Sequence, residues 1–369
     1  MTVCRGCGST SLAFAFGMDP MPLAGGFAES AAAASAAQTY PMEWYWCPTC
    51  GLVNVGEDVA DEVLFHHYRY ASSDVPGLVR HFEAYAEFLR ERLGDGPLRI
   101  VEIGCNDGVL LRRLPEAWER IGVDPSDVAS SADTDGYQLI PAPFSSDLAG
   151  SIGRADVVTS SNALAHFTAI GDAWDGIAAL QPREVWIEVH DLLATLESGQ
   201  WDTVYHEHKV EWSAAALARA GAVRGLEAFA VARLPLHGGL LRMGFRPGRT
   251  SAEPPRRPDF GLLAASYAGR RETAAYRAVQ EAPWAMAYGA AGRATVYLNQ
   301  VPEMRLRAVV DGSPHRIGLW VPGRALEIVT PEVFDREPPP VTLVTAWNHA
   351  ADIRRHHPGY TGRWLTAFG

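Results

Sequence analysis

Four cysteines near the start of the chain form two C-x-x-C pairs, Cys4 with Cys7 and Cys47 with Cys50. A glycine follows each pair at once, where a tight metal-binding knuckle needs a permissive backbone. Four thiolates close the tetrahedral shell of Zn²⁺, so such a site stabilises a lobe and leaves catalysis to other residues. Redox-active pairs would need a thioredoxin-like strand and helix, and neither pair is followed by that pattern. We therefore expect one structural zinc ion in an N-terminal zinc-ribbon lobe.

A glycine-containing loop follows an apolar strand expected over 98–103. Gly104 and Gly108 let the backbone pass closely beneath a ligand at the carboxyl end of that strand, where open α/β sheets bind small molecules. Asp124 ends the next strand, the position at which such folds hold ribose hydroxyls, although an acidic turn after an ordinary buried strand would look the same. The E-x-G-x-x-x-G spacing differs from the dinucleotide pattern and resembles the first motif of class I S-adenosylmethionine methyltransferases. The expected cofactor-binding residues are Glu102, Gly104, Asn106, Gly108, Asp124 and Asn162.

Histidines and acids cluster in the segment Tyr205-His206-Glu207-His208. Imidazole titrates near neutral pH, and a neighbouring carboxylate such as Glu207 can orient it or raise its basicity, so His208 is the best candidate for a general base. His206 and His208 could also be read as metal ligands with His190, but no carboxylate or third ligand has the expected spacing. An isolated histidine such as His166 is more often structural than catalytic.

The elements around these motifs alternate between strands and helices. A helix is expected over 77–93, because its apolar residues recur at helical spacing and a Gly-Asp-Gly-Pro breaker follows. The strands expected next cover 98–103, 120–123, 155–159 and 184–188, and the helices cover 108–113 and 172–180. This alternation predicts a doubly wound parallel sheet.

A second, weaker α/β unit is expected near the C-terminus. Its predicted strands cover 285–288, 308–310, 342–345 and 364–367. The proline-bearing stretch 246–257 is interpreted as a linker. We therefore expect an α/β protein with a zinc lobe over 1–72, a Rossmann-like domain over 73–245 and a second α/β domain over 246–369.

Composition excludes several classes of protein. The 369 residues include 32 Lys and Arg against 43 Asp and Glu, a net charge of −11, and the basic residues are scattered rather than gathered on one face, so nucleic acid is not the expected partner. No run of eighteen apolar residues and no export signal is visible, so we expect no membrane partner and a cytoplasmic location.

The motifs occur in an order that resembles one enzyme family. The four-cysteine lobe is followed by Val101 to Gly108, Asn162 to His166, Asp202 to His208, His237-Gly238-Gly239 and Ala346-Trp347-Asn348. This order resembles the nucleotide-sugar C-methyltransferases of antibiotic biosynthesis, which methylate C3 of dTDP-4-keto-deoxysugars. The resemblance implies a S-adenosylmethionine cofactor, a structural zinc ion, a dTDP-sugar as small-molecule substrate, and a nucleotide-sugar site in the last domain.

The resemblance also implies roles for individual residues. His208 would be the base that removes a proton beside the ketone, with Glu207 in support, and Tyr205, His166 and Tyr70 would lie near the reacting sugar. The substrate-binding residues would be Tyr70, His237, Tyr288, Gly289 and Arg293. Two features depart from the family: the segment after His237-Gly238-Gly239 is shorter, and Arg293 stands where lysine is expected, although arginine can also clamp a diphosphate. His237 either touches the sugar or merely ends a strand.

Two other functions compete with this hypothesis. O- or N-methylation of another small natural product would use the same scaffold with a different acceptor atom. A zinc-ribbon protein that binds RNA or a partner, with a degenerate core, would not need the intact Glu102, Gly104, Gly108 and Asp124, and its RNA would be repelled by the charge of −11.

Overall fold

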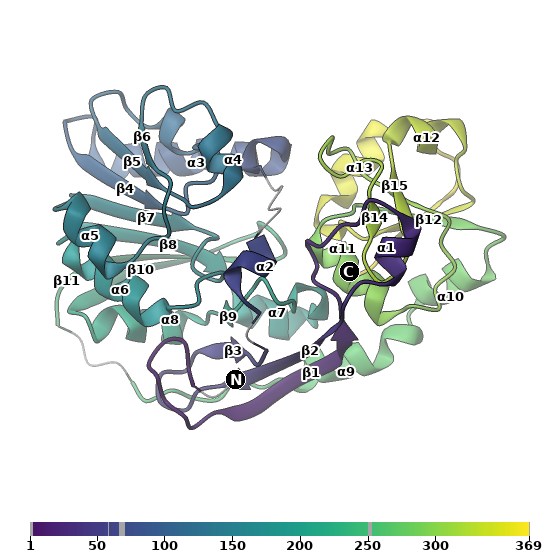
Figure 1. Ribbon diagram of the computed structural model, residues 1–369, viewed down its shortest axis with the longest axis horizontal. Helices are drawn as coiled ribbons and strands as arrows, with labels where there is room; N and C mark the ends of the chain where they lie inside the picture. Colours follow the sequence, from purple (N-terminus) through teal and green to yellow (C-terminus); the bar gives the residue numbers. More distant parts are fainter. Residues whose placement is uncertain (1–2, 58, 66–70, 250–252, 369) are drawn as a thin grey trace.

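The computed structural model describes residues 3–57, 59–65, 71–249 and 253–368, which form three sheets of four, seven and six strands. Figure 1 shows the two larger sheets as separate bodies, with the N-terminal strands running beneath both of them. The mixed α/β class, the N-terminal lobe and the two α/β domains that follow it agree with the expectation from the sequence.

The N-terminal lobe is a small antiparallel sheet in the order β1-β2-β3-β9. Its first three strands are β1 (Ala13–Met21), β2 (Tyr40–Trp46) and β3 (Val53–Val55). The fourth, β9 (Val210–Glu211), comes from the central domain and pairs with β3. The helices here are α1 (Ala31–Ser35), in the alanine-rich stretch, and α2 (Asp61–Phe65).

The central domain is a sheet in the order β10-β11-β8-β7-β4-β5-β6, in which the last five strands of that order are parallel. Its strands are β4 (Arg99–Ile103), β5 (Glu119–Val123), β6 (Gln138–Ile140), β7 (Val157–Ser161), β8 (Glu184–His190), β10 (Leu226–Leu234) and β11 (Leu240–Pro247). Its helices are α3 (Pro76–Leu93), α4 (Asp127–Ser131), α5 (Ser146–Ile152), α6 (Ile170–Ala179), α7 (Leu192–Ser198) and α8 (Ala214–Ala222).

Two details of this domain differ from the sequence prediction. The helix expected over 108–113 is only a 3-10 turn, Leu111–Arg113, because Leu114 precedes Pro115 and a residue before proline is driven into the extended conformation. The parallel sheet also continues into an antiparallel hairpin, β10–β11, which the alternation of strands and helices did not predict. Strand β11 ends at Pro247, inside the stretch interpreted as a linker.

The C-terminal domain has a six-stranded sheet in the order β14-β15-β13-β12-β16-β17, parallel except at β14. Its strands are β12 (Ala285–Tyr288), β13 (Val309–Val310), β14 (Trp320–Val321), β15 (Leu326–Val329), β16 (Val341–Val344) and β17 (Arg363–Thr366). Its helices are α9 (Gly261–Ala268), α10 (Ala274–Glu281), α11 (Gly292–Gln300), α12 (Pro331–Arg336) and α13 (Ala350–His356).

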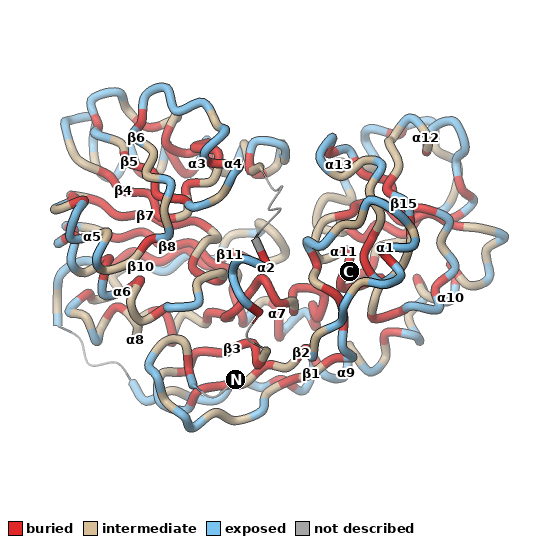
Figure 2. The backbone as a smooth tube through the Cα atoms, in the orientation of Figure 1, coloured by how far each residue is buried: buried red, intermediate tan, exposed pale blue. Residues whose placement is uncertain are grey.

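The buried core joins the three parts of the chain. Met42 and Trp44 of the N-terminal sheet belong to the same apolar cluster as Val296 and Tyr297 of α11. The zinc-lobe residue Leu52 instead belongs to the core of the central domain. In Figure 2 the buried backbone, in red, is concentrated in the sheets and in α11. Among the described helices, none combines the length and apolarity that a membrane span requires.

Candidate functional site

The four N-terminal cysteines converge at one point. Their Sγ atoms all lie within 4.8 Å of one another, with Cys4 and Cys50 3.5 Å apart and Cys7 and Cys47 3.7 Å apart. A tetrahedral zinc ion with Zn–S bonds of about 2.3 Å needs sulfurs about 3.8 Å apart, so the cluster fits the ion. All four sulfurs are needed to fill that shell, which leaves no position for a substrate.

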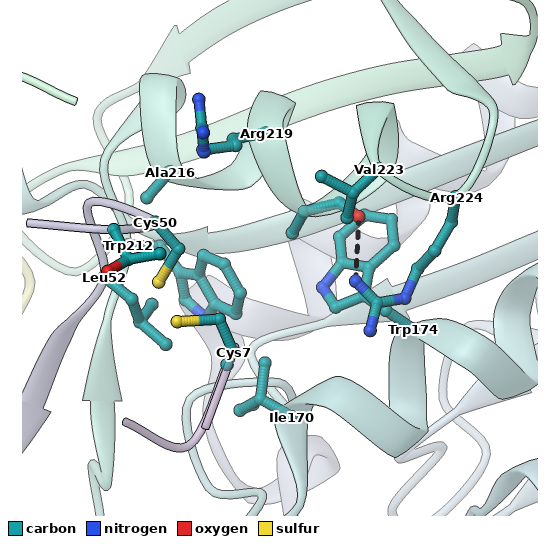
Figure 3. A pocket seen from close by; sticks show the side chains of 13 residues that line it. Cys7, Cys50, Leu52, Ile170, Trp174, Trp212, Ala216, Arg219, Val223 and Arg224 are labelled. Carbon is teal, nitrogen blue, oxygen red and sulfur yellow. Dashed lines mark hydrogen bonds between the residues drawn. The ribbon is translucent and has the colours of Figure 1, made fainter. Parts of the chain in front are cut away.

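A pocket lies where the zinc lobe meets α6 and α8, and Figure 3 shows the sulfurs of Cys7 and Cys50 at its edge beside two tryptophans. Arg224 on its far wall donates to the Gly171 carbonyl at 2.8 Å and to Asp175. The pocket contains none of the residues expected to act in catalysis. It is the contact between two domains, and the candidate catalytic site lies elsewhere.

The loop after β4 is folded so that only glycine fits at two positions. Gly104 and Gly108 have φ angles of 73° and 72°, the left-handed region that favours glycine. A Cβ on Gly104 would clash with the side chain of Ala163, and one on Gly108 would clash with the hydroxyl of Tyr137. The backbone therefore turns tightly at the carboxyl end of β4, beside β5 and β7, which is the edge of the sheet where open α/β folds bind ligands.

Acceptor groups without partners lie at or just after the carboxyl ends of β4 and β7. Among the described residues, Glu102 Oε2, Asp107 Oδ1 and Asn162 Oδ1 are buried and accept no hydrogen bond. Burial and the nearby charge of Asp124 raise the pKa of Glu102. The carboxylate of Asp124 accepts hydrogen bonds from the backbone N–H groups of Asn106, at 2.8 Å, and Ser126, at 2.9 Å. This set of acceptors, above a glycine cradle, suits the hydroxyl and amino groups of a nucleoside.

The glycine loop also holds the segment that follows residues 66–70. Asn106 Oδ1 accepts from the Ser72 backbone N–H at 2.9 Å, and Asp107 Oδ2 accepts from that of Ser73 at 3.0 Å. Tyr70, expected to contact the substrate, lies outside the described residues.

The candidate catalytic histidines His208 and His166 form one cluster with His190. His208 is buried, with 5% of the residue exposed. The centroid of its ring lies 5.2 Å from that of the His166 ring and 4.8 Å from that of the His190 ring. The hydroxyl of Tyr205 is 2.7 Å from His208 Nε2. A Cβ built on Gly292, the first residue of α11, would lie 3.6 Å from the Tyr205 ring. The pair Tyr205–His208 thus lies where the central domain meets the C-terminal domain.

Glu207 is oriented differently from the sequence-based expectation. Its Oε1 accepts from the backbone N–H of Gly25 at 2.7 Å, and its own carbonyl oxygen is 2.7 Å from His166 Nδ1. The carboxylate near the His208 ring belongs instead to Glu211, whose Oε1 is 3.4 Å from Nδ1. The sequence analysis missed Glu211 because β9 is only two residues long and leaves no periodic signal.

Arg293 joins three segments rather than presenting free donors. Its Nε and Nη2 donate to the two carboxylate oxygens of Asp202 at 2.9 and 2.7 Å, and its Nη1 donates to the His237 carbonyl at 2.6 Å. The guanidinium also lies 4.7 Å from the ring centroid of Trp347, whose Nε1 donates to Asp202. The side chain of Arg293 is 13% exposed, so the structure places it in a buried ion pair.

The other two C-terminal candidates are also engaged within the domain. The Tyr288 hydroxyl is 2.8 Å from His357 Nε2, so this side chain points into the domain. Gly289 has a φ of 102°, and a Cβ there would clash with Ala346. Of the two, only the backbone of Gly289 is arranged to approach a ligand closely.

Comparison with known proteins assigns each part of the chain to a described domain. Residues 4–65 match a zinc binding domain, residues 75–231 a methyltransferase domain and residues 273–368 a C-methyltransferase C-terminal domain. The chain is 27% identical over 383 residues to the C-methyltransferase NovU of Streptomyces niveus, covering 95% of this chain and 90% of that protein. The chain is thus an S-adenosylmethionine-dependent C-methyltransferase similar to NovU. This C-methyltransferase is a S-adenosylmethionine-dependent enzyme with a structural zinc ion.

Solved structures similar to this C-methyltransferase match about half of it. One is magnesium protoporphyrin IX methyltransferase (ChlM) of Synechocystis PCC 6803 with bound SAH, which is 14% identical with a TM-score of 0.37, covering 53% of this chain and 90% of that one. Another is the 1,6-didemethyltoxoflavin-N1-methyltransferase of Burkholderia thailandensis, 16% identical with a TM-score of 0.35, covering 53% and 95%.

The electrostatics of the C-methyltransferase favour neutral histidines in the cluster. Burial lowers the pKa of His166, His190 and His208. The His166 ring lowers the pKa values of His190 and His208 further, and the His190 ring lowers that of His208. The guanidinium of Arg293 acts in the same direction on His190 and His208. A neutral imidazole is the form that accepts a proton.

Proposed function

We propose that this C-methyltransferase methylates a carbon beside the ketone of a nucleotide-activated sugar, after His208 removes the proton from that carbon. The observation that carries the proposal is the hydroxyl–imidazole pair of Tyr205 and His208, 2.7 Å apart and next to the first residue of α11. Carbon needs such a base because a ring C–H is not nucleophilic until it is deprotonated, whereas a hydroxyl or amine needs little activation.

Carbon as the methylated atom is supported by the C-methyltransferase C-terminal domain and by the similarity to NovU. The turn from β12 to α11 brings the backbone of Gly289 and the first turn of α11 together, and a helix N-terminus favours a diphosphate. We propose that the nucleotide part binds at this turn. Arg293 contributes by holding Asp202 and the His237 carbonyl in place, because its donors are already engaged there.

The chain's own residues account for binding and for the proton. When bound, S-adenosylmethionine supplies an electrophilic methyl group on its sulfonium sulfur. We assign its binding to the Gly104–Gly108 cradle and to Glu102, Asp124 and Asn162, whose acceptors fit nucleoside donors.

The proton transfer involves His208 and Tyr205. His208 Nε2 takes the proton, and the electron pair of the broken C–H bond is left on the substrate as an enolate. Before the transfer the Tyr205 hydroxyl donates to the Nε2 lone pair; once Nε2 carries the proton, that hydroxyl is free to donate to the enolate oxygen instead. The His166 ring lies next to that of His208 and adjusts the protonation of the pair. The enolate carbon would then form the new C–C bond to the methyl group as the bond from that methyl to sulfur breaks, with the electron pair left on sulfur as S-adenosylhomocysteine.

A labelling experiment tests both the substrate class and the chemistry. The purified protein is incubated with methyl-labelled S-adenosylmethionine and a panel of dTDP-4-ketosugars, and the product's carbon connectivity is determined. A label on the carbon beside the ketone is expected. In parallel, substrate and S-adenosylhomocysteine in D₂O should exchange the hydrogen on that carbon. A label on oxygen or nitrogen, with no exchange, would overturn C-methylation of a sugar in favour of an O- or N-methyltransferase.

A further inference from the structure

Glu211 is a buried acid that the proposed mechanism does not use. Its residue is 1% exposed on β9, and neither carboxylate oxygen has a hydrogen-bond partner among the residues that the structure describes. Strand β9 pairs with β3 in fixed register, with Glu211 opposite Val53. The position of this carboxylate is therefore set by the sheet of the N-terminal lobe, and it needs an explanation because an unsatisfied buried carboxylate is costly.

The atom that faces Glu211 is equally unsatisfied. His208 Nδ1 is buried without a hydrogen bond in the described part of the chain, and Glu211 Oε1 lies 3.4 Å from it. The opposite nitrogen, Nε2, contacts the Tyr205 hydroxyl at 2.7 Å. The ring thus lies between an acid on one nitrogen and a hydroxyl on the other. Hydrogen bonds of this kind are often long without substrate and shorten in the complex.

We propose that Glu211 is a positioning residue that holds the proton of His208 on Nδ1 and thereby leaves the lone pair on Nε2 beside Tyr205. This inference rests on the proposed role of His208 as the base. The partner of one imidazole nitrogen determines which nitrogen carries the proton, and only the other is then able to accept one. When Nε2 takes the substrate proton, the C–H bond breaks and an N–H bond forms. Burial raises the pKa of Glu211, and the positive charge that develops on the ring acts in the opposite direction, so the carboxylate that accepts from Nδ1–H is favoured as the imidazolium forms.

The other groups around His208 do not supply that compensation. His166 and His190 are neutral neighbours, and Arg293 is a cation already paired with Asp202. A backbone carbonyl, that of Thr203, also faces the ring. It could hold the same N–H but carries no net charge. Among these groups, Glu211 is therefore the acid within reach of the ring. The experiment has to separate the effect of Glu211 on the His208 proton from that of the Thr203 carbonyl.

The tautomer is measured without any substrate. Long-range ¹H–¹⁵N spectra of ¹⁵N-histidine-labelled full-length protein are recorded for wild type, E211Q and E211M, with the His208 signals assigned by H208A. We expect Nδ1–H in wild type and loss of that preference in E211M. The proposal is overturned if wild type carries the proton on Nε2, or if E211M leaves the His208 signals unchanged because the Thr203 carbonyl is sufficient. E43Q, in the same sheet, is the matched control and should leave the signals as in wild type.

Hydrogen exchange measures the consequence for the base. With a dTDP-4-ketosugar and S-adenosylhomocysteine in D₂O, E211Q should exchange about 10²-fold more slowly than wild type with KM retained, because proton abstraction is weakened and binding is not. E211Q is nearly isosteric, so it keeps the test valid if E211M does not fold. Unchanged exchange in E211Q overturns the inference. If wild type exchanges no ketosugar, the proposed function fails, and the spectra alone then decide the role of Glu211.

Discussion

At the residue scale, the proposed role of His208 as a base depends on how burial changes the pKa of its ring. Burial and the neighbouring His190, His166 and Arg293 all favour the neutral ring, so its pKa lies well below the ordinary value. A base must be neutral to act. Because a lowered pKa keeps the ring neutral as the pH falls, the ring stays competent at pH values where an exposed histidine is already charged.

The pH profile of kcat/KM checks this. We expect the acid limb, where rate is lost as the pH falls through the His208 pKa in the free enzyme, to lie below about pH 6.5, the unperturbed value for histidine. An acid limb at or above that value would contradict a buried neutral base. H208A should lower kcat by about 10² to 10⁴-fold and leave the affinity for S-adenosylhomocysteine unchanged.

Asp124 offers a second test at the residue scale. D124A removes the acceptor for the Asn106 and Ser126 backbone N–H groups and, in our proposal, for the ribose hydroxyls. Hydrogen bonds to a charged group contribute about 1.5 to 3 kcal/mol, so the dissociation constant of S-adenosylhomocysteine should rise about tenfold or more. Isothermal titration measures it. D127A, an exposed acid at the start of α4, is the control and should bind like wild type.

At the element scale, an ion pair connects α11 to the turn just before Tyr205 and His208. Arg293 in the first turn of α11 binds Asp202, which begins the segment containing Tyr205 and His208. The same guanidinium binds the His237 carbonyl in the turn between β10 and β11. One side chain therefore sets the relative position of three elements around the candidate site. An arginine that clamped a diphosphate would instead keep its donors free for the ligand.

Arg293 is tested by replacement with lysine, the residue that the family would have here. R293K keeps the charge but loses the planar fork that binds both Asp202 oxygens and the carbonyl. We expect the free energy of unfolding to fall by about 1 to 3 kcal/mol, as measured by urea denaturation. R307K changes the same group in the half-exposed ion pair with Glu337 and should cost less than about 1 kcal/mol. Equal effects of the two variants would contradict a positioning role for Arg293.

At the scale of the whole molecule, the N-terminal lobe connects both larger domains. Its strands share an apolar cluster with α11, and its Leu52 packs into the central core. Lys209, next to His208, forms an ion pair with Asp61 of α2. Strand β3 also pairs with β9, which carries Glu211. The lobe therefore supports the candidate site from outside it.

Removing the zinc ion tests this connection. C47S should abolish zinc binding and lower the melting temperature, because a structural zinc ion contributes folding free energy directly. Since the lobe packs on both domains, we also expect faster proteolysis within residues 253–368, measured by limited digestion. Metal analysis checks the zinc content, and zinc added back after chelation should restore wild type but not C47S. Unchanged zinc content and melting in C47S would show that these cysteines do not hold the ion.

The sequence by itself determined the local features. The cysteine pairs, the glycine loop and the strands before and after it depend on residues close together in the chain, where spacing and backbone preference fix the outcome. The order of the zinc-binding, methyltransferase and C-terminal domains followed from the same motifs. The sequence alone did not predict which carboxylate faces His208. Glu207 is adjacent in sequence, but in an irregular turn adjacency does not fix the direction of a side chain, and its carboxylate reaches Gly25.

Only the tertiary structure decided the contacts between distant segments. Glu211 comes to Nδ1 of His208 because β9 pairs with β3, more than 150 positions earlier in the chain. Arg293 and Asp202, which are 91 positions apart in the sequence, form an ion pair because α11 packs against the turn just before Tyr205 and His208. Pairing and packing of this kind depend on the shape of the whole core, and no local pattern records them.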